Sequence, residues 1–424
     1  MASNSPPRGQ HLLEADRAFV TGGGVLARLF ASAFRFMIDR VDAGLEAGAI
    51  EARLPDGSFR RLGGRGPGPV AEVRLNSWRP LLRLATGGSV GWFKAWLEGE
   101  WESPDPVPLF DLFMRNRVSL GETGRAQGPA RLLNRLAHRL RINDRLGAKR
   151  NIAFHYDLGN DFYAAWLDPG MTYSSAVFAE PITEAEPLEA AQQRKIRLLL
   201  DRLQLQPGQR LLEIGCGWGS LAEIAARDYG VHVTGITLSE AQRDYACQRL
   251  AAAGLDNRAD IQLCDYRDAE GRFDAVVSVE MVEAVGEAFW PDYLAAIHRL
   301  LKPRGRAALQ LISMDSAIFE GYAKNADFIQ AYIFPGGMLI DEERFRALAE
   351  ATGLDWQDRQ GYGLHYAETL RRWRERFDHV VESGALPPGF DAHFRQLWRY
   401  YLMYCEGGFR GGGIDVAQVT LVRR

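Results

Sequence analysis

Short apolar runs alternate with amphipathic segments along the chain from about residue 151 onward. Runs rich in Val, Ile, Leu and Ala that end in Gly, Asp or Ser are typical of strands, and the segments between them have helical spacing. Five strands are predicted within residues 210–219, 231–239, 259–268, 272–283 and 305–314. Because a helix follows each strand, the pattern predicts an α/β domain with a doubly wound, Rossmann-like parallel sheet and its ligand loops at one edge.

The first 145 residues differ in character from the rest of the chain. Gly- and Pro-rich connectors at residues 63–70 and 102–108 separate a few amphipathic segments there. Together with the total length of 424 residues, this change predicts two domains. We expect a small N-terminal domain over residues 1–145 and a larger domain over residues 146–424.

Two helical segments of the N-terminal part carry side chains that could meet a lipid surface. Residues 131–150 hold seven Lys or Arg and one acidic residue, Asp144, beside a stripe of leucines. Trp92, Phe93 and Trp96 also have helical spacing. Each segment either packs against the domain or contacts the bilayer interface. Inward packing is favoured for the aromatic residues, whereas the sequence does not decide between the two interpretations of the basic helix.

Composition narrows the classes of function. A formal net charge of −3 excludes a uniformly basic protein that coats nucleic acid. No apolar stretch of 18 residues is present and the N-terminus lacks a signal-peptide core, so we expect a cytoplasmic protein that reaches a membrane only at its surface. The four cysteines are scattered without metal-ligand spacing, which predicts reduced thiols and no metal site.

The strongest chemical signal is the turn after the first predicted strand. Gly215, Gly217 and Gly219 stand at alternate positions there, before a helix that is predicted to begin near Ser220. Residues without side chains let the backbone approach a ligand, and a helix N-terminus offers free N–H groups. Glu213 makes the pattern E-x-G-x-G-x-G rather than the dinucleotide pattern G-x-G-x-x-G, which favours adenosylmethionine over NAD. We expect Glu213 to hold a water or the methionine ammonium group.

The ends of the next two strands supply candidate partners for a nucleoside. The acidic residue that commonly binds ribose hydroxyls is missing after the second strand, so Thr237 and Gln242 are the ribose candidates. Asp265 and Tyr266 end the third strand, where they are placed to reach an adenine ring. Together with the glycine turn, these residues predict one adenosylmethionine site at the edge of the sheet.

Seven motifs in order resemble the cyclopropane fatty acid synthase family, including its mycolic acid cyclopropane synthase branch. They are HYDLGNDFY (155–163), MTYSSAVF (171–178), LLEIGCGWGS (211–220), GITLSEAQ (235–242), VSVEMVEAVG (277–286), YIFPGGML (332–339) and HYAETLRRW (365–373). The match covers residues 150–424, and residues 88–105 resemble the smaller N-terminal domain of the bacterial enzymes. The resemblance implies transfer of a methyl carbon from adenosylmethionine to a cis double bond of a phospholipid acyl chain.

The resemblance also implies which residues bind the cofactor and an anion. The cofactor positions that match the family are Tyr173, Ser174, Gly215, Gly217, Thr237, Leu238, Gln242 and Tyr266. The family's base is a bound bicarbonate, which a Cys, a Glu, a His and a Tyr hold. Glu283 matches that glutamate and Tyr366 matches that tyrosine.

Three other positions depart from the family's anion site. Ser175 replaces the cysteine, Gln310 replaces the histidine, and Glu280 stands where the cyclopropane synthases usually have glycine. Serine and glutamine can still hydrogen-bond an anion. However, Glu280 and Glu283 lie three residues apart near a helix start, and a desolvated glutamate beside a like charge could itself be the base. An exposed or salt-bridged Glu280 is the structural alternative, and binding of bicarbonate stays open.

The sequence therefore predicts an enzyme that visits the inner membrane surface and acts on unsaturated acyl chains, with no nucleic acid partner and with a homodimer as one arrangement. After methyl transfer, loss of a proton from the new methyl group closes a cyclopropane ring, which is the primary prediction. Loss from a neighbouring carbon gives a methylene- or methyl-branched chain, the main alternative. A small-molecule methyltransferase and a non-catalytic lipid- or adenosylmethionine-binding paralogue are less favoured.

Overall fold

The computed structural model describes residues 8–14, 31–121, 158–325 and 327–424. The chain forms two compact units. The N-terminal unit contains residues 1–142, 315–335 and 388–414, and the C-terminal unit contains residues 143–314, 336–387 and 415–424. Two later segments of the chain thus join the N-terminal residues. The predicted basic helix at residues 131–150 lies outside the described residues.

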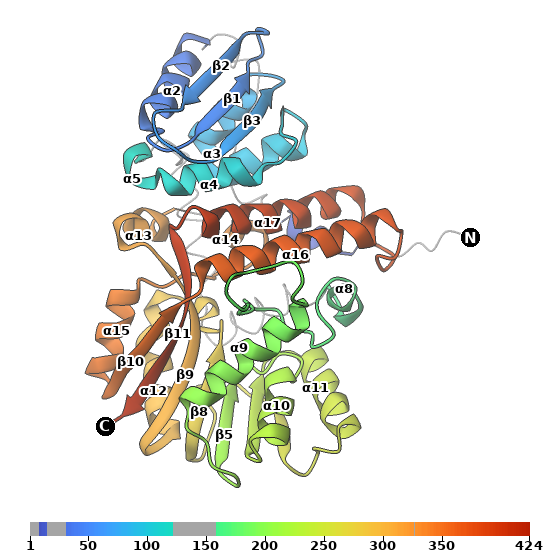
Figure 1. The fold of residues 1–424 in the computed structure, drawn as a ribbon, viewed down its shortest axis with the longest axis vertical. Coiled ribbons are helices and arrows are strands. Elements are labelled where there is room, and N and C mark those ends of the chain that lie inside the picture. Colours follow the sequence, from blue (N-terminus) through green and yellow to red (C-terminus); the bar gives the residue numbers. More distant parts are fainter. Residues whose placement is uncertain (1–7, 15–30, 122–157, 326) are drawn as a thin grey trace. The chain divides into compact units, whose positions relative to one another are not determined.

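The C-terminal unit is built on a seven-stranded sheet with the strand order β10-β11-β9-β8-β5-β6-β7 (Figure 1). The strands are β5 (Arg210–Ile214), β6 (His232–Thr237), β7 (Ala259–Leu263), β8 (Phe273–Val279), β9 (Leu301–Met314), β10 (Leu354–Gly361) and β11 (Ile414–Arg423). β5 to β9 pair in parallel, whereas β10 pairs with β11 in antiparallel fashion. The strand order reverses between β5 and β8, and such a switch point opens a crevice for a ligand at the carboxyl ends of the strands.

Helices cover both faces of this sheet (Figure 1). The helices of this unit are α8 (Asn160–Ala164), α9 (Leu188–Arg202), α10 (Ser220–Asp228), α11 (Glu240–Ala252), α12 (Trp290–Leu300), α15 (Glu342–Ala351) and α16 (Gly363–Glu382), with 3-10 turns at Val282–Ala284 and Glu287–Phe289. Leu199 of α9, Leu221 of α10 and Leu250 of α11 share one buried cluster with Leu211 and Val277 of the strands. Burial of these apolar stripes attaches the three helices to the sheet.

All five predicted strands form, as β5 to β9, and the predicted doubly wound fold is confirmed. Helix α10 begins at the expected residue, Ser220, and the helix after the second predicted strand, α11, begins at Glu240. β10 and β11 were not specified from the sequence. The reason for β10 is that it lies at the sheet edge, where most of its side chains are exposed and leave no apolar alternation to detect.

The N-terminal unit has its own four-stranded sheet, with the order β2-β1-β3-β4. Its strands are β1 (Ala49–Arg53), β2 (Phe59–Gly63), β3 (Val70–Leu75) and β4 (Trp101–Glu102). Its helices are α1 (Gln10–Glu14), α2 (Ala31–Gly44), α3 (Arg79–Leu97), α4 (Val107–Arg115), α5 (Arg117–Leu120), α13 (Ser316–Ala323), α14 (Phe328–Tyr332) and α17 (Ala392–Arg410). Across both units, none of the described helices is long and apolar enough to cross a bilayer.

Aromatic side chains form the core of the N-terminal unit. Phe93 has no exposed surface, and its ring centroid lies 4.9 Å from that of Phe328, 4.8 Å from that of Tyr332 and 4.9 Å from that of Tyr400. The nearby Trp92 is also buried, so inward packing of these two residues is confirmed. The aromatic runs around Phe328 and Tyr400 therefore supply the core of this unit.

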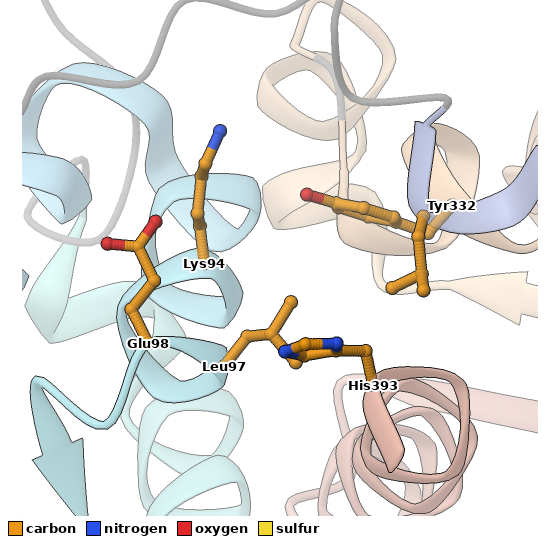
Figure 2. Close-up of a pocket in the computed structure, with 6 residues that line it drawn as sticks. Lys94, Leu97, Glu98, Tyr332 and His393 are labelled. Carbon is orange, nitrogen blue, oxygen red and sulfur yellow. The ribbon is translucent and has the colours of Figure 1, made fainter. Parts of the chain in front are cut away.

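A cavity of about 260 Å³ lies within the N-terminal unit (Figure 2). Its lining residues are Leu13, Lys94, Leu97, Glu98, Tyr332 and His393. Glu98 lies one helical turn after Lys94, so side chains of opposite charge stand beside apolar ones. Such a mixed lining does not single out an anion or a cation as its ligand.

We predict that Asn116 stabilises the N-terminal unit. Its Oδ1 accepts hydrogen bonds from the N–H groups of Glu46 and Ala47 at 3.0 and 2.9 Å, and its Nδ2 donates to the carbonyls of Ala47 and Leu112. Asn116→Ala leaves these backbone groups without hydrogen-bond partners, so the free energy of unfolding in urea should fall by about 2–4 kcal/mol. Asn76→Ala, which removes two hydrogen bonds at an exposed site, should cost less than about 1 kcal/mol. Equal losses in the two variants would contradict this account.

Candidate functional site

The turn after β5 has a backbone that suits glycine. The φ angles of Gly215, Gly217 and Gly219 are 81°, 52° and 83°, in the left-handed region that other residues rarely adopt. A Cβ on Gly219 would lie 2.9 Å from the Cβ of Ala246, so packing against α11 excludes a side chain. A Cβ on Gly217 would meet no atom of the described chain within 4 Å. The turn therefore leaves open space where a ligand can approach the backbone.

Glu213 ends β5 beside this turn and is 3% exposed. Its Oε2 is buried and has no hydrogen-bond partner among the described residues. Burial raises the pKa of Glu213 to about 8, although the nearby Lys195 ammonium opposes the rise. A buried carboxyl oxygen without a partner suits a cationic N–H donor. The ammonium group of the methionine part of adenosylmethionine is such a donor, so this residue fits the cofactor.

The end of β6 lies next to the glycine turn, because the N–H of Gly215 donates to the carbonyl of Ile236 at 2.9 Å. There the Thr237 hydroxyl donates to the Gln242 side-chain carbonyl at 3.0 Å, and both residues are buried. Tyr266 follows β7, is buried, and burial raises the pKa of its phenol to about 12. These polar groups lie where strand order predicts the ribose and adenine of a bound nucleoside.

Helix α9 holds residues 172–176 through two side chains that the sequence analysis missed. The Gln192 Nε2 donates to the carbonyls of Thr172 and Ser174 at 3.3 and 2.8 Å. The Lys195 Nζ donates to the Ser174 Oγ at 2.6 Å. Both side chains are 1% exposed. A signal was available, because glutamine and lysine in the buried apolar stripe of a helix need polar partners.

Tyr173, in the same segment, belongs to an aromatic cluster. Its ring centroid lies 5.4 Å from that of Tyr163, 5.7 Å from that of Trp166 and 5.3 Å from that of Trp373. Trp373 in turn lies 6.2 Å from the ring of Tyr366. Aromatic faces attract a desolvated cation by about 2 kcal/mol. The cluster therefore suits a sulfonium or a carbocation.

The Glu280 carboxylate is the centre of the second part of the site. Its Oε1 accepts hydrogen bonds from the Ser175 N–H and the Gln310 Nε2, each at 2.8 Å, and its Oε2 accepts one from the Tyr366 hydroxyl at 2.8 Å. Three positions that the resemblance assigned to anion binding thus donate to a carboxylate of the protein itself. Ser175 does so through its backbone, since its hydroxyl donates to the Ala176 carbonyl at 3.0 Å. The donors are already engaged, so this arrangement does not fit bicarbonate.

The backbone of Glu280 is unusual for a residue with a side chain. Its φ is 49°, in the left-handed region, where a side chain costs roughly 1 kcal/mol or more. Glycine adopts such a φ without this cost. The Glu280 N–H donates to the Gln310 carbonyl at 2.8 Å, which helps to hold this conformation. A strained residue whose carboxylate meets three donors indicates a functional role.

Glu283 lies beside Glu280 but differs in its surroundings. Its Oε1 accepts a hydrogen bond from the Ile312 N–H, whereas its buried Oε2 has no partner among the described residues. Burial, together with the negative charge of Glu280, raises the pKa of Glu283 to about 8. At neutral pH Glu283 is therefore protonated, and two neighbouring acids can hold different protonation states.

Lys195 supplies a buried positive charge to this site. Burial lowers its pKa to about 8, and the negative charges of Glu280, Asp168 and Glu213 oppose that shift. The same lysine thus acts electrostatically on Glu213, the acid beside the glycine turn, and on Glu280. Since a buried carboxylate is costly without a compensating charge, Lys195 favours the ionised form of each.

The structure arranges the candidate residues in two groups within the C-terminal unit. The first comprises the cofactor candidates, which lie at or after the ends of β5, β6 and β7 and in the segment that α9 holds: Tyr173, Ser174, Glu213, Gly215, Gly217, Gly219, Thr237, Leu238, Gln242 and Tyr266. The second contains Ser175, Glu280, Glu283, Gln310 and Tyr366. Ser174 and Ser175 are adjacent, so the covering segment belongs to both.

Comparisons with known proteins agree with this geometry. The family model described as mycolic acid cyclopropane synthetase matches residues 144–419. Tuberculostearic acid methyltransferase UfaA1 of Mycobacterium tuberculosis is 42% identical over 80% of this chain and 80% of its own length. Cyclopropane-fatty-acyl-phospholipid synthase of Escherichia coli K12 is 32% identical over 88% of this chain and 96% of its own. The structure of mycolic acid cyclopropane synthase CmaA1 with SAH and CTAB matches with a TM-score of 0.61 and 32% identity, over 65% of this chain and 98% of that one.

The fold, the glycine turn and these relatives define an adenosylmethionine-dependent methyltransferase. The chain belongs to the mycolic acid cyclopropane synthetase family. Its named relatives are cyclopropane synthases and fatty acid methyltransferases, so its class of reaction is methylation of lipid acyl chains.

We predict that Gly217→Ala weakens binding of adenosylmethionine roughly tenfold or more, because the new Cβ enters the open space in front of the turn. Isothermal titration calorimetry measures the affinity. Gly254→Ala is a matched control, since Gly254 also has a positive φ, of 69°, and a Cβ there also meets nothing within 4 Å. Both variants carry the same kind of backbone strain. Equal affinities in the two variants would show that the turn at Gly217 does not contact the cofactor.

Proposed function

We propose that this enzyme transfers the methyl carbon of adenosylmethionine to the cis double bond of an acyl chain on a membrane phospholipid, and that Glu280 accepts the proton that must leave. The product is a methylene-branched acyl chain. The observation that carries the proposal is the Glu280 carboxylate, held by the Ser175 N–H, the Gln310 amide and the Tyr366 hydroxyl.

When bound, adenosylmethionine supplies an electrophilic methyl group. An alkene is a weak nucleophile, so the protein must hold it close to that group and exclude water. The aromatic cluster around Tyr173 serves this purpose, and its ring faces also stabilise the positive charge that methyl addition leaves on the acyl chain. Glu213 and the glycine turn orient the cofactor.

Glu280 then acts as the general base. Three hydrogen-bond donors and the Lys195 ammonium favour its ionised form, while burial raises its pKa and strengthens it as a base. A hydride shift from the methyl-bearing carbon to the adjacent cationic carbon moves the charge to the branch point. Loss of a proton from the new methyl group to Glu280 gives the C=CH₂ double bond of the methylene branch. Atoms and charge balance without a further reactant.

Cyclopropane formation is the second candidate. It needs the same base and the same proton but no hydride shift, since the C–H electron pair closes the ring on the cationic carbon. The Escherichia coli phospholipid synthase favours it, because the similarity covers 96% of that enzyme. The relative named tuberculostearic acid methyltransferase, at 42% identity, favours the branched product. The departures at Ser175, Gln310 and Glu280 favour the branched product as well, and we therefore place it first.

The direct test uses purified protein, adenosylmethionine with a labelled methyl group, and vesicles of cis-monounsaturated phospholipid. Mass spectrometry after derivatisation of double bonds should find acyl chains that are one CH₂ heavier and keep an alkene. The same mass gain without an alkene would replace the branched product by the cyclopropane. Absence of label in any lipid, with the cofactor still bound, would refute the phospholipid substrate.

We predict that Glu280→Gln lowers turnover by roughly 10²- to 10⁴-fold, because an amide of the same shape cannot accept the proton. Binding of adenosylmethionine should remain, since Glu280 lies in the second group of residues. Glu280→Gly gives a sharper result, because glycine accepts the φ of 49° and frees the three donors. We expect activity of this variant only with added bicarbonate. Full turnover of the glutamine variant would exclude Glu280 as the base.

We also predict a pH dependence of kcat with its acid limb above the ordinary glutamate range. The base must be ionised to act, and burial raises the pKa of Glu280, so kcat falls as the pH is lowered through that raised pKa. Stopped assays across a pH series with a constant ionic strength measure the limb. Glu283→Gln should leave the limb in place, since burial and the negative charge of Glu280 keep Glu283 protonated across that pH range. A limb that moves downward in this variant would show that Glu283 is ionised in that pH range and would contradict this order of protonation.

A further inference from the structure

Gln418, on β11, has no role in the reaction described above, yet its polar side chain is completely buried. We propose that Gln418 is a positioning residue that sets the orientation of the Gln310 amide and thereby keeps a hydrogen-bond donor aimed at Glu280. The inference rests on the proposed function in one respect, namely that Glu280 is the base.

The contacts of Gln418 connect it to the base through one residue. Its Nε2 donates to the Gln310 Oε1 at 3.1 Å and to the Lys195 carbonyl at 3.3 Å. The Gln310 Nε2 in turn donates to the Ser175 carbonyl at 3.1 Å and to the Glu280 Oε1 at 2.8 Å. All four hydrogen bonds lie within the C-terminal unit.

The end partners determine which way each amide points. The Arg202 Nε donates to the Gln418 Oε1 at 3.3 Å, and a guanidinium can only donate. The carbonyl of Lys195 can only accept, so the Gln418 amide has one orientation that satisfies both neighbours. With Gln418 so placed, the Gln310 Oε1 faces a donor and its Nε2 faces two acceptors. Reversal of either amide would set oxygen against oxygen in a buried place.

The result is a chain of donors that starts at a cation and ends at the base. It runs from Arg202 through Gln418 and Gln310 to Glu280, and linked hydrogen bonds of this kind polarise one another. The other groups that face Glu280 are the Ser175 N–H, the Tyr366 hydroxyl, the Lys195 ammonium and the neighbouring Glu283. Burial opposes ionisation of Glu280, so the loss of a single donor should raise its pKa further.

The test reverses the donor–acceptor direction of this series of hydrogen bonds without changing the shape of the side chain. In Gln418→Glu, the new carboxylate accepts from Arg202, which favours its ionised form, but it cannot donate to Gln310. The Gln310 amide must turn over, and its oxygen then faces Glu280. We expect the acid limb of kcat to rise by about one pH unit or more and kcat at neutral pH to fall about tenfold. The KM for adenosylmethionine should stay unchanged, because Gln418 does not contact the cofactor group.

A double-mutant cycle with Gln310→Leu separates positioning from general damage. Once the amide at position 310 is absent, Gln418→Glu has no amide to reorient. Only the direct effect of its charge, which Arg202 partly compensates, should remain, so the acid limb should move less in the Gln310→Leu background than in the native one. Gln418→Met, which removes the donor without reversing the polarity, should shift the limb less than Gln418→Glu does. An unmoved limb in a folded Gln418→Glu protein, or an equal shift in both backgrounds, would overturn the proposal.

The same cycle, measured on the free energy of unfolding, distinguishes this proposal from the proposed function. If Glu280→Gln keeps full turnover, Glu280 is not the base and the proposed function fails, whereas a coupling between positions 418 and 310 in stability would still support the positioning role. Additive effects on stability together with an unmoved limb would reject the positioning role while the proposed function stands.

Discussion

The central constraint on this protein is the burial of a negative charge. A carboxylate that is taken out of water is tolerated only where hydrogen-bond donors and a compensating cation replace the water. Glu280 has both, from four different parts of the C-terminal unit: the segment at Ser175, β9 through Gln310, α16 through Tyr366, and α9 through Lys195. These parts must come together for the charge to be stable, so the fold and the chemistry of the site depend on the same contacts.

One lysine links the two halves of the site. Lys195 lies in the buried stripe of α9, hydrogen-bonds the covering segment at Ser174, and acts electrostatically on both Glu213 and Glu280. The cofactor half and the base half therefore share a single compensating charge. A cationic cofactor beside Glu213 would add a second positive charge to the same buried region, so its binding should also favour the ionised form of Glu280.

The sequence predicted the parts of the fold whose signal is local, and it missed those that depend on distant partners. Strands β5 to β9 and the turn from Gly215 to Gly219 were predicted, because apolar runs and glycine spacing record their surroundings directly. The importance of Glu280 could be suspected, since it replaces a glycine. Its three donors come from positions 175, 310 and 366, and no spacing rule relates them. Gln418 could not be recognised for the same reason, because its role depends on contact with Gln310, which lies 108 residues away in the chain on the neighbouring strand β9.

The left-handed backbone of Glu280 bears on how such a site can arise. Among the amino acids, glycine adopts this conformation without cost, so a protein with glycine here already has the backbone that the glutamate needs. The codons of glycine and glutamate can differ by a single base at the second position. A site with glycine at this position and a site that carries a carboxylate here can therefore be one nucleotide apart, and no rearrangement of the main chain has to accompany the change.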